Sequence, residues 1–109
     1  MFIAMNRFKV ILGQEEAFEA VWLGRDSHLE GVPGFLAFHL LRGPMREDHT
    51  LFSSHTQWRS RADFEAWTKS EAFRAAHKDA RPRAGIYQGP PEFEAFETIQ
   101  EVLPAGADR

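Results

Sequence analysis

A tryptophan and a histidine ten residues apart are the residues of this sequence best suited to chemistry. Trp67 ends one short helical pattern, and Ser70 is placed to cap the next helix, with Glu71 in its first turn. Phe73 and His77 are four residues apart, so a helix places them on one face. A neutral imidazole beside apolar side chains is a sensible axial ligand for a haem iron. A histidine on a helix is otherwise only packed or solvated, so the spacing alone leaves both interpretations open.

Asn6 is a polar residue on an otherwise apolar strand face. Strand alternation places five residues on that face, which are Phe2, Ala4, Asn6, Phe8 and Val10. An amide buried there costs on the order of a few kcal/mol unless it finds a hydrogen-bond partner. Asn6 therefore either satisfies a neighbouring backbone group or serves a ligand.

The composition is that of one ordinary globular domain. The 109 residues are 43% hydrophobic and 27% charged, and we expect residues 1–103 to form a single domain with a flexible tail at 104–109. The net charge of -3 gives no basic field for nucleic acid, and the absence of cysteine removes disulfides and thiolate sites. No segment resembles a signal peptide or a membrane span, so a cytoplasmic protein is expected.

The periodicity predicts an alternation of strands and helices. Strands are expected at 2–11, 35–41, 50–58 and 93–102, helices at 14–29 and after Ser60 and Ser70, and connections at 42–49 and 79–91. This order is the ferredoxin-like βαββαβ arrangement of the α+β class, an antiparallel sheet with helices on one face. The other face also carries apolar residues, so we expect a homodimer in which two sheets form a dimeric α+β barrel.

Four segments give the chain a family resemblance. They are Asn6-Arg7-Phe8, Pro33-Gly34-Phe35-Leu36, Thr56-Gln57-Trp58-Arg59-Ser60, and the run from Phe64 to His77 continuing into Lys78. With these segments nearly the whole chain resembles the antibiotic biosynthesis monooxygenases. Asn6, Trp67 and Ala75-Ala76-His77 together make it most similar to the non-canonical haem-degrading monooxygenases of the bacterial Isd and mycobacterial type.

The resemblance implies a role for each of these residues. His77 matches the proximal histidine that holds the haem iron, and Asn6 matches the amide that donates a hydrogen bond on the distal side of the haem. Trp67 matches the tryptophan that presses on the distal face and distorts the macrocycle. Trp22 and Phe73 are expected in the pocket wall, where a core role is also open to them.

Cationic residues are candidates for the haem propionates. Arg81 and Arg83, with Lys78, lie in the loop after His77, and Arg25 lies on the expected first helix. A solvated basic loop explains the first three equally well.

The remaining histidines have no metal-site spacing with a carboxylate or another histidine. His39 and His55 lie in expected strands, on faces that can point into the dimer, and are interpreted as structural. His28 and His49 are interpreted as surface or turn residues.

The leading functional hypothesis is an oxygen-dependent haem-degrading monooxygenase that opens the porphyrin ring and releases iron. Haem is then both substrate and cofactor, and an external electron donor or reductase is required, because the sequence carries no flavin or nicotinamide motif. Two alternatives stay open. One is a cofactor-free monooxygenase acting on a quinol or a polyketide, and the other is a haem-binding protein without turnover.

Overall fold

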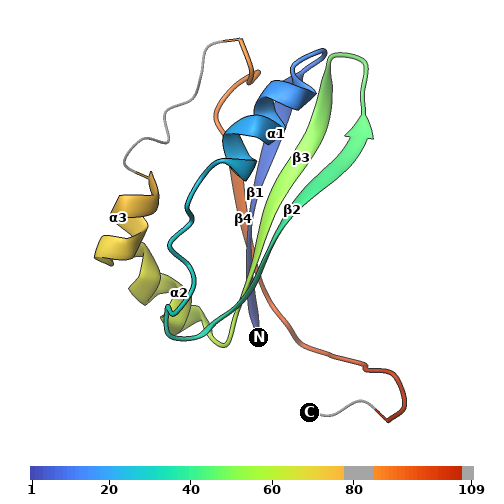
Figure 1. The fold of residues 1–109 in the computed structure, drawn as a ribbon. Coiled ribbons are helices and arrows are strands. Elements are labelled where there is room, and N and C mark those ends of the chain that lie inside the picture. Colours follow the sequence, from blue (N-terminus) through green and yellow to red (C-terminus); the bar gives the residue numbers. More distant parts are fainter. Residues whose placement is uncertain (78–84, 107–109) are drawn as a thin grey trace.

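The computed structural model describes residues 1–77 and 85–106 of the chain. Along the described chain the elements are β1 (Phe2–Ile11), α1 (Glu15–Leu23), β2 (Phe35–Met45), β3 (His49–Trp58), α2 (Arg61–Thr68), α3 (Glu71–His77) and β4 (Glu92–Glu97) (Figure 1). No helix in these two ranges is long enough and apolar enough to cross a bilayer.

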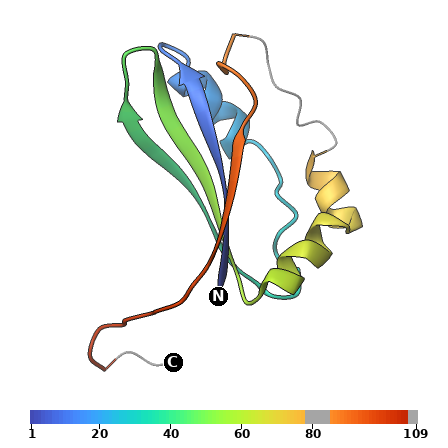
Figure 2. The ribbon, with the colours of Figure 1, turned by 180° about the vertical axis from the view of Figure 1, so that it is seen from behind.

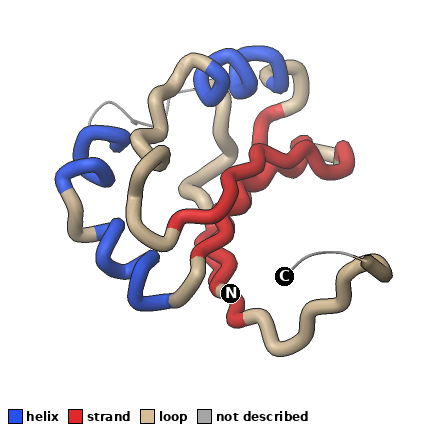
Figure 3. The backbone as a smooth tube through the Cα atoms, turned by 60° about the horizontal axis from the view of Figure 1, so that its bottom comes forward, coloured by secondary structure: helices blue, strands red, loops and turns tan. Residues whose placement is uncertain are grey.

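The strands form one antiparallel sheet in the order β2-β3-β1-β4. Sequence neighbours β1 and β2 are not adjacent in this order, because the helical crossovers carry the chain past the middle of the sheet. All described helices lie on one side of the sheet (Figure 3). The structure therefore confirms the predicted ferredoxin-like α+β fold.

Two clusters of buried side chains lie between the helices and the sheet. The cluster under α1 contains Phe8, Val10, Phe18, Phe52 and Ile86. The cluster nearer α2 contains Phe2, Ala4, Leu29 and Trp58, with Trp67 and Phe64 packed against it. The β1 residues of both clusters are those that strand alternation placed on one face with Asn6.

None of the described helices lies on the opposite side of the sheet, which we call the outer face. The register places the following residues on it in rows that run across the strands: Ala37, Gln57, Ile3 and Phe96; His39, His55, Met5 and Glu94; Leu41, Ser53, Arg7 and Glu92. Arg7 is ion-paired with Glu94, and Lys9 with Glu92. This face mixes apolar side chains with neutralised charges.

The first helix is shorter than the predicted segment 14–29. It ends at Leu23, where the backbone N–H of Gly24 donates to the carbonyl oxygen of Ala20 at 3.1 Å and that of Arg25 donates to Trp22 at 3.2 Å. Beyond it, the N–H of His28 donates to the Asp26 carboxylate at 2.9 Å, a local bond that competes with helix continuation. Leu29 lies beyond the helix but is buried. Its apolar side chain therefore belongs to the core, although the sequence pattern assigns it to a helix.

Two strand ends also differ from the prediction. β2 continues to Met45 through an irregular register after Arg42, so the connection to β3 is only the turn at 46–48. β4 ends at Glu97 and not at residue 102, and the chain beyond it leaves the sheet (Figures 1 and 2). Ile99 and Val102 are 97% and 80% exposed. Their apolar character predicted a strand, but neither is paired.

Candidate functional site

Two serine caps position the helix pair α2–α3. The Ser60 hydroxyl accepts a hydrogen bond from the backbone N–H of Asp63 at 3.2 Å, and the Ser70 hydroxyl accepts one from Phe73 at 3.1 Å. Each satisfies a backbone donor that the first turn of a helix leaves unpaired. The restart at Ser70 turns the chain so that the ring of Trp67, on α2, meets the rings of α3.

Trp67, Phe73 and His77 form one aromatic group. The Phe73 and His77 rings stack with centroids 4.1 Å apart, and the Trp67 ring meets Phe73 edge-on at 4.8 Å. The Trp67 and His77 centroids are 5.9 Å apart. The predicted one-turn spacing of Phe73 and His77 is therefore confirmed, and Trp67 joins them. His77 is the exposed member of the group.

One nitrogen of His77 has a fixed partner. Its Nδ1 lies 2.8 Å from the backbone carbonyl oxygen of Phe73. Because a carbonyl only accepts, Nδ1 of the neutral ring carries the proton and donates it. The lone pair of Nε2 is then available, which is the tautomer in which histidine binds metals.

Arg25 connects α1 to the end of α3. Its guanidinium carbon lies 4.4 Å from the centroid of the Trp22 ring, and its Nη2 donates to the carbonyl oxygen of Ala76 at 3.1 Å. Burial lowers the pKa of Arg25, although an arginine stays protonated at neutral pH. No carboxylate in residues 1–77 or 85–106 forms an ion pair with it. Among the described residues, the site thus holds a half-buried cation without an anionic partner.

Asn6 lies on the helix-covered face of the sheet, half-buried between the two core clusters. The register places it in one row with Leu40, Ser54 and Phe93. Within the described chain its side chain makes no hydrogen bond, and none joins it to the aromatic group of α2 and α3. Both interpretations of Asn6, an amide satisfied by neighbouring backbone and an amide that serves a ligand, therefore stay predictions.

The predicted residues thus fall into three sets. Trp67, Phe73 and His77 are in direct contact, Trp22 and Arg25 are joined to them through Ala76, and Asn6 lies on the sheet. Lys78, Arg81 and Arg83 lie outside the described residues.

Sequence reasoning missed Phe38, whose ring is parallel to that of Trp22 within 12°, at a centroid distance of 6.2 Å. It also missed Ser54, directly opposite Asn6 on β3. The strand register identifies Ser54, and the packing of α1 on the sheet identifies Phe38; no local sequence pattern predicts either neighbour.

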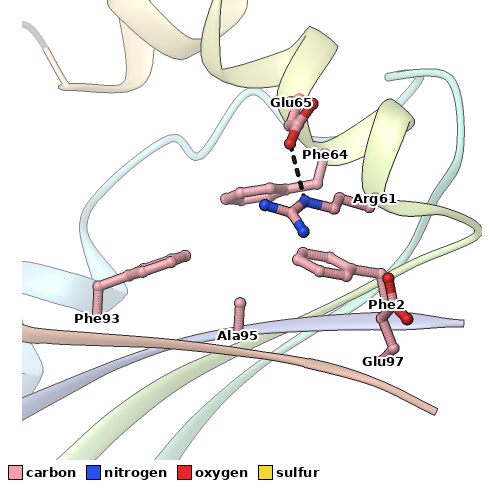
Figure 4. A pocket seen from close by; sticks show the side chains of 7 residues that line it. All are labelled: Phe2, Arg61, Phe64, Glu65, Phe93, Ala95 and Glu97. Atoms are coloured by element: carbon pink, nitrogen blue, oxygen red, sulfur yellow. Dashed lines mark hydrogen bonds and ion pairs between the residues drawn. The ribbon is translucent and has the colours of Figure 1, made fainter. Parts of the chain in front are cut away.

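A separate cavity of about 270 Å³ lies between α2 and the edge strand β4. Phe64 and Phe93 lie on opposite sides of it, and the Arg61 guanidinium extends into it from the ion pair with Glu65 (Figure 4). None of the predicted site residues lines this cavity. It is distinct from the aromatic group at His77.

Comparison with known proteins places the chain in context. The sequence pattern of the antibiotic biosynthesis monooxygenases matches residues 1–79. A "heme-degrading monooxygenase" of Shouchella clausii is 43% identical over 56 residues, which are 50% of this chain and 52% of the relative. The chain thus spans about half the length of the curated relatives it matches.

Solved structures match over more of the chain. The heme degrader MhuD of Mycobacterium tuberculosis, solved with two hemes in its active site, has a TM-score of 0.70 at 29% identity, covering 94% of this chain and 99% of MhuD. A putative antibiotic biosynthesis monooxygenase of Bacillus cereus has a TM-score of 0.79 at 16% identity, covering 97% and 98%. At that identity the second likeness shows the fold alone.

Proposed function

The chain belongs to the antibiotic biosynthesis monooxygenase family, and we propose that it is a haem-degrading member that opens the porphyrin ring and releases iron. The observation that carries this proposal is the available Nε2 of His77, beside the Trp67 and Phe73 rings. The likeness to heme-degrading relatives supports it.

The residues present fit a haem. The indole nitrogens of Trp22 and Trp67 are buried and lack hydrogen-bond partners in the part of the chain described. Such donors cost free energy until an acceptor is supplied. The half-buried Arg25 cation lacks a carboxylate, and haem carries two propionates. Haem offers something to each of these groups. Its iron can bind Nε2 of His77, and its two propionates can accept hydrogen bonds from the guanidinium of Arg25 and from the indole N–H groups.

Each residue then has a distinct task. Nε2 of His77 would hold the iron, and Phe73 fixes the imidazole by stacking and through its carbonyl oxygen. Asn6 would donate a hydrogen bond from its side-chain amide toward the reacting oxygen, and Trp67 would press on the flat ring and shape it. Haem supplies the iron at which dioxygen is activated, and electrons come from an external donor or reductase.

We propose further that the outer face packs against a second copy of the chain. Leu41 and Phe96 on this face are 41% and 47% exposed, and Ile3 and Met5 lie between them. Exposed apolar side chains on a sheet face that no described helix covers favour an association site. Sedimentation of the wild type is expected to give a dimer, and a charge at the centre of the face (Met5→Glu) is expected to give a monomer with the same far-ultraviolet circular dichroism.

The test of the proposed function is a haemin titration. Wild-type protein is expected to shift the Soret band of haemin and then to bleach it in the presence of ascorbate and oxygen. His77→Ala is expected to lose the axial ligation, seen as a changed Soret maximum. His28→Gln, on an exposed turn, serves as the matched histidine control and is expected to behave as wild type.

A variant of Asn6 tests whether the protein degrades haem or only binds it. Asn6→Ala is expected to bind haemin with wild-type affinity and to bleach it at least about 10-fold more slowly, as for the loss of one positioned hydrogen-bond donor. Binding without bleaching by the wild type would favour a haem-binding protein without turnover. No Soret shift at all would favour a cofactor-free monooxygenase.

A further inference from the structure

Three residues with metal-binding side chains lie side by side on the outer face. His39 of β2 is directly opposite His55 of β3, and His55 is directly opposite Met5 of β1. The alternation that turns Asn6 toward the helices turns Met5 the other way, so all three side chains share the outer face. Paired side chains on neighbouring strands are about 5 Å apart at Cβ, within reach of a common ligand.

Within the described residues, one of the two histidine rings has a buried nitrogen without a partner. Their centroids are 6.0 Å apart at an interplanar angle of 56°, and Nδ1 of His55 is buried without a hydrogen-bond partner in the described part of the chain. The other three histidines each have one nitrogen close to a partner, at Asp26, Asp48 and the Phe73 carbonyl. A buried ring nitrogen without a partner costs free energy that a bound ligand would recover.

The ring spacing suits one shared metal ion. With metal–nitrogen bonds of about 2.0–2.1 Å and a tetrahedral angle, two imidazoles on one ion have centroids roughly 5 Å apart. The observed spacing is 6.0 Å, so the centroids would approach by roughly 1 Å, which a rotation of the exposed His39 side chain can supply. No third histidine, aspartate, glutamate or cysteine joins the pair in the described residues. A further ligand must come from another side chain, and Met5 is the neighbour that offers one.

We propose that His39, His55 and Met5 form a binding site for Cu(I). Imidazole suits copper, zinc, iron and nickel, whereas a thioether favours copper in its soft monovalent state. The three ligands are uncharged, and the nearest acidic side chain, Glu94, is already paired with Arg7. A site without net negative charge favours a monovalent over a divalent ion. In the proposed dimer this face meets a second copy, which can fill the fourth position.

The test uses haem-free protein under anaerobic conditions, with Cu(I) titrated in competition with the coloured chelator bicinchoninate. The wild type is expected to withdraw one Cu(I) per chain. His39→Gln and His55→Gln are each expected to weaken Cu(I) binding at least about 100-fold, because each leaves a single imidazole. Met5→Leu is expected to weaken Cu(I) about 10-fold and to leave Zn(II) binding unchanged, since zinc makes little use of a thioether.

His28→Gln and His77→Ala are the controls, and both are expected to keep the site. Copper binding that persists in His39→Gln and His55→Gln, or that is lost with His77→Ala, overturns the proposal. Circular dichroism of each variant separates loss of ligand from loss of fold. The result is independent of the haem proposal, because a haemin titration of His39→Gln reports on His77 alone.

Discussion

The two ends of the helix layer pack on the same sheet face in different ways. At one end, Phe18 of α1 is fully buried, and its ring meets that of Phe52 at a centroid distance of 4.4 Å. At the other end, neither α2 nor α3 has any buried residue, although Trp67 and Phe73 are large aromatic side chains. Both ends contain aromatic side chains, but only the helix at the α1 end, which we call the sealed end, has a buried side chain.

This difference separates stability from binding. The cluster around Phe18 is complete within the chain, so it accounts for the core of the fold. Within residues 1–77 and 85–106, the Nε2 atom of His77 and the indole N–H groups of Trp22 and Trp67 have no hydrogen-bond partner, and the Arg25 guanidinium has no carboxylate. A ligand can supply partners to these groups, whereas none of the buried residues Phe8, Val10, Phe18, Phe52 and Ile86 has a polar side-chain atom that needs one.

The largest expected effect tests the sealed end. Phe18→Ala is expected to lower the free energy of unfolding by about 3–5 kcal/mol, as for a large aromatic removed from a packed core. Phe73→Ala is expected to cost roughly 1 kcal/mol, because its ring is only partly buried and loses less transfer energy. Urea denaturation of both variants measures the contrast. Equal losses would show that the α2–α3 end is as well packed as the α1 end.

A bound ligand is expected to stabilise the α2–α3 end of the helix layer more than the α1 end. Haemin at 100 times its Kd should raise the free energy of unfolding by about 2.7 kcal/mol. Amide exchange should slow most in residues 61–77 and least in residues 15–23, where the packing is already complete. Uniform protection of both segments would contradict the distinction between the two ends.

The serine caps offer a smaller and more local comparison. Ser60→Ala and Ser70→Ala are each expected to cost about 1 kcal/mol, since each removes a side-chain acceptor from a helix N-terminus. Only Ser70→Ala is expected also to weaken haemin binding, because Ser70 begins the helix that carries His77. Thermal melts and haemin titrations of the two variants measure these effects. Equal haemin affinities would show that the Ser70 cap does not position the haemin site.

The smallest effect is a pH dependence at the sealed end. The Thr50 hydroxyl donates to Glu15 at 2.7 Å, and this bond lowers the pKa of Glu15 below its usual 4.5. A carboxyl with a lowered folded-state pKa stabilises the fold above its unfolded pKa and loses that contribution as the pH falls through the folded value. Thr50→Val should therefore flatten the loss of stability below pH 4.5. Thr56→Val is the control, since Thr56 donates to the Ala4 carbonyl and not to a carboxylate.

Sequence reasoning succeeded where the determining interaction is local. The caps at Ser60 and Ser70 lie three residues from their backbone donors, and the stacking of Phe73 on His77 spans one helical turn. Strand alternation likewise assigned the face of Asn6. The helix prediction failed at residues 24–29. The apolar periodicity continues past Gly24, but the helix ends there, and the Asp26 side chain accepts a hydrogen bond from the backbone beyond it.

Pairings distant in sequence followed no local pattern. The hydrogen bond from Arg25 to the Ala76 carbonyl oxygen joins residues 51 apart in sequence, and it depends on how α1 and α3 pack on the sheet. His39 and His55 show no metal-site spacing along the chain, yet the β2–β3 register makes them direct partners. A register shift of one residue would turn one of the two rings to the other face.

By itself, then, the sequence determined the α+β class, the helix caps, the faces of the strands and the imidazole one turn from Phe73, because hydrogen-bonding and side-chain periodicity act over a few residues. The tertiary structure alone decided which strands are neighbours, that Trp67 joins Phe73 and His77, that Arg25 reaches α3, and that two histidines and a methionine share a row. These depend on packing and register, which bring together residues that the chain keeps far apart.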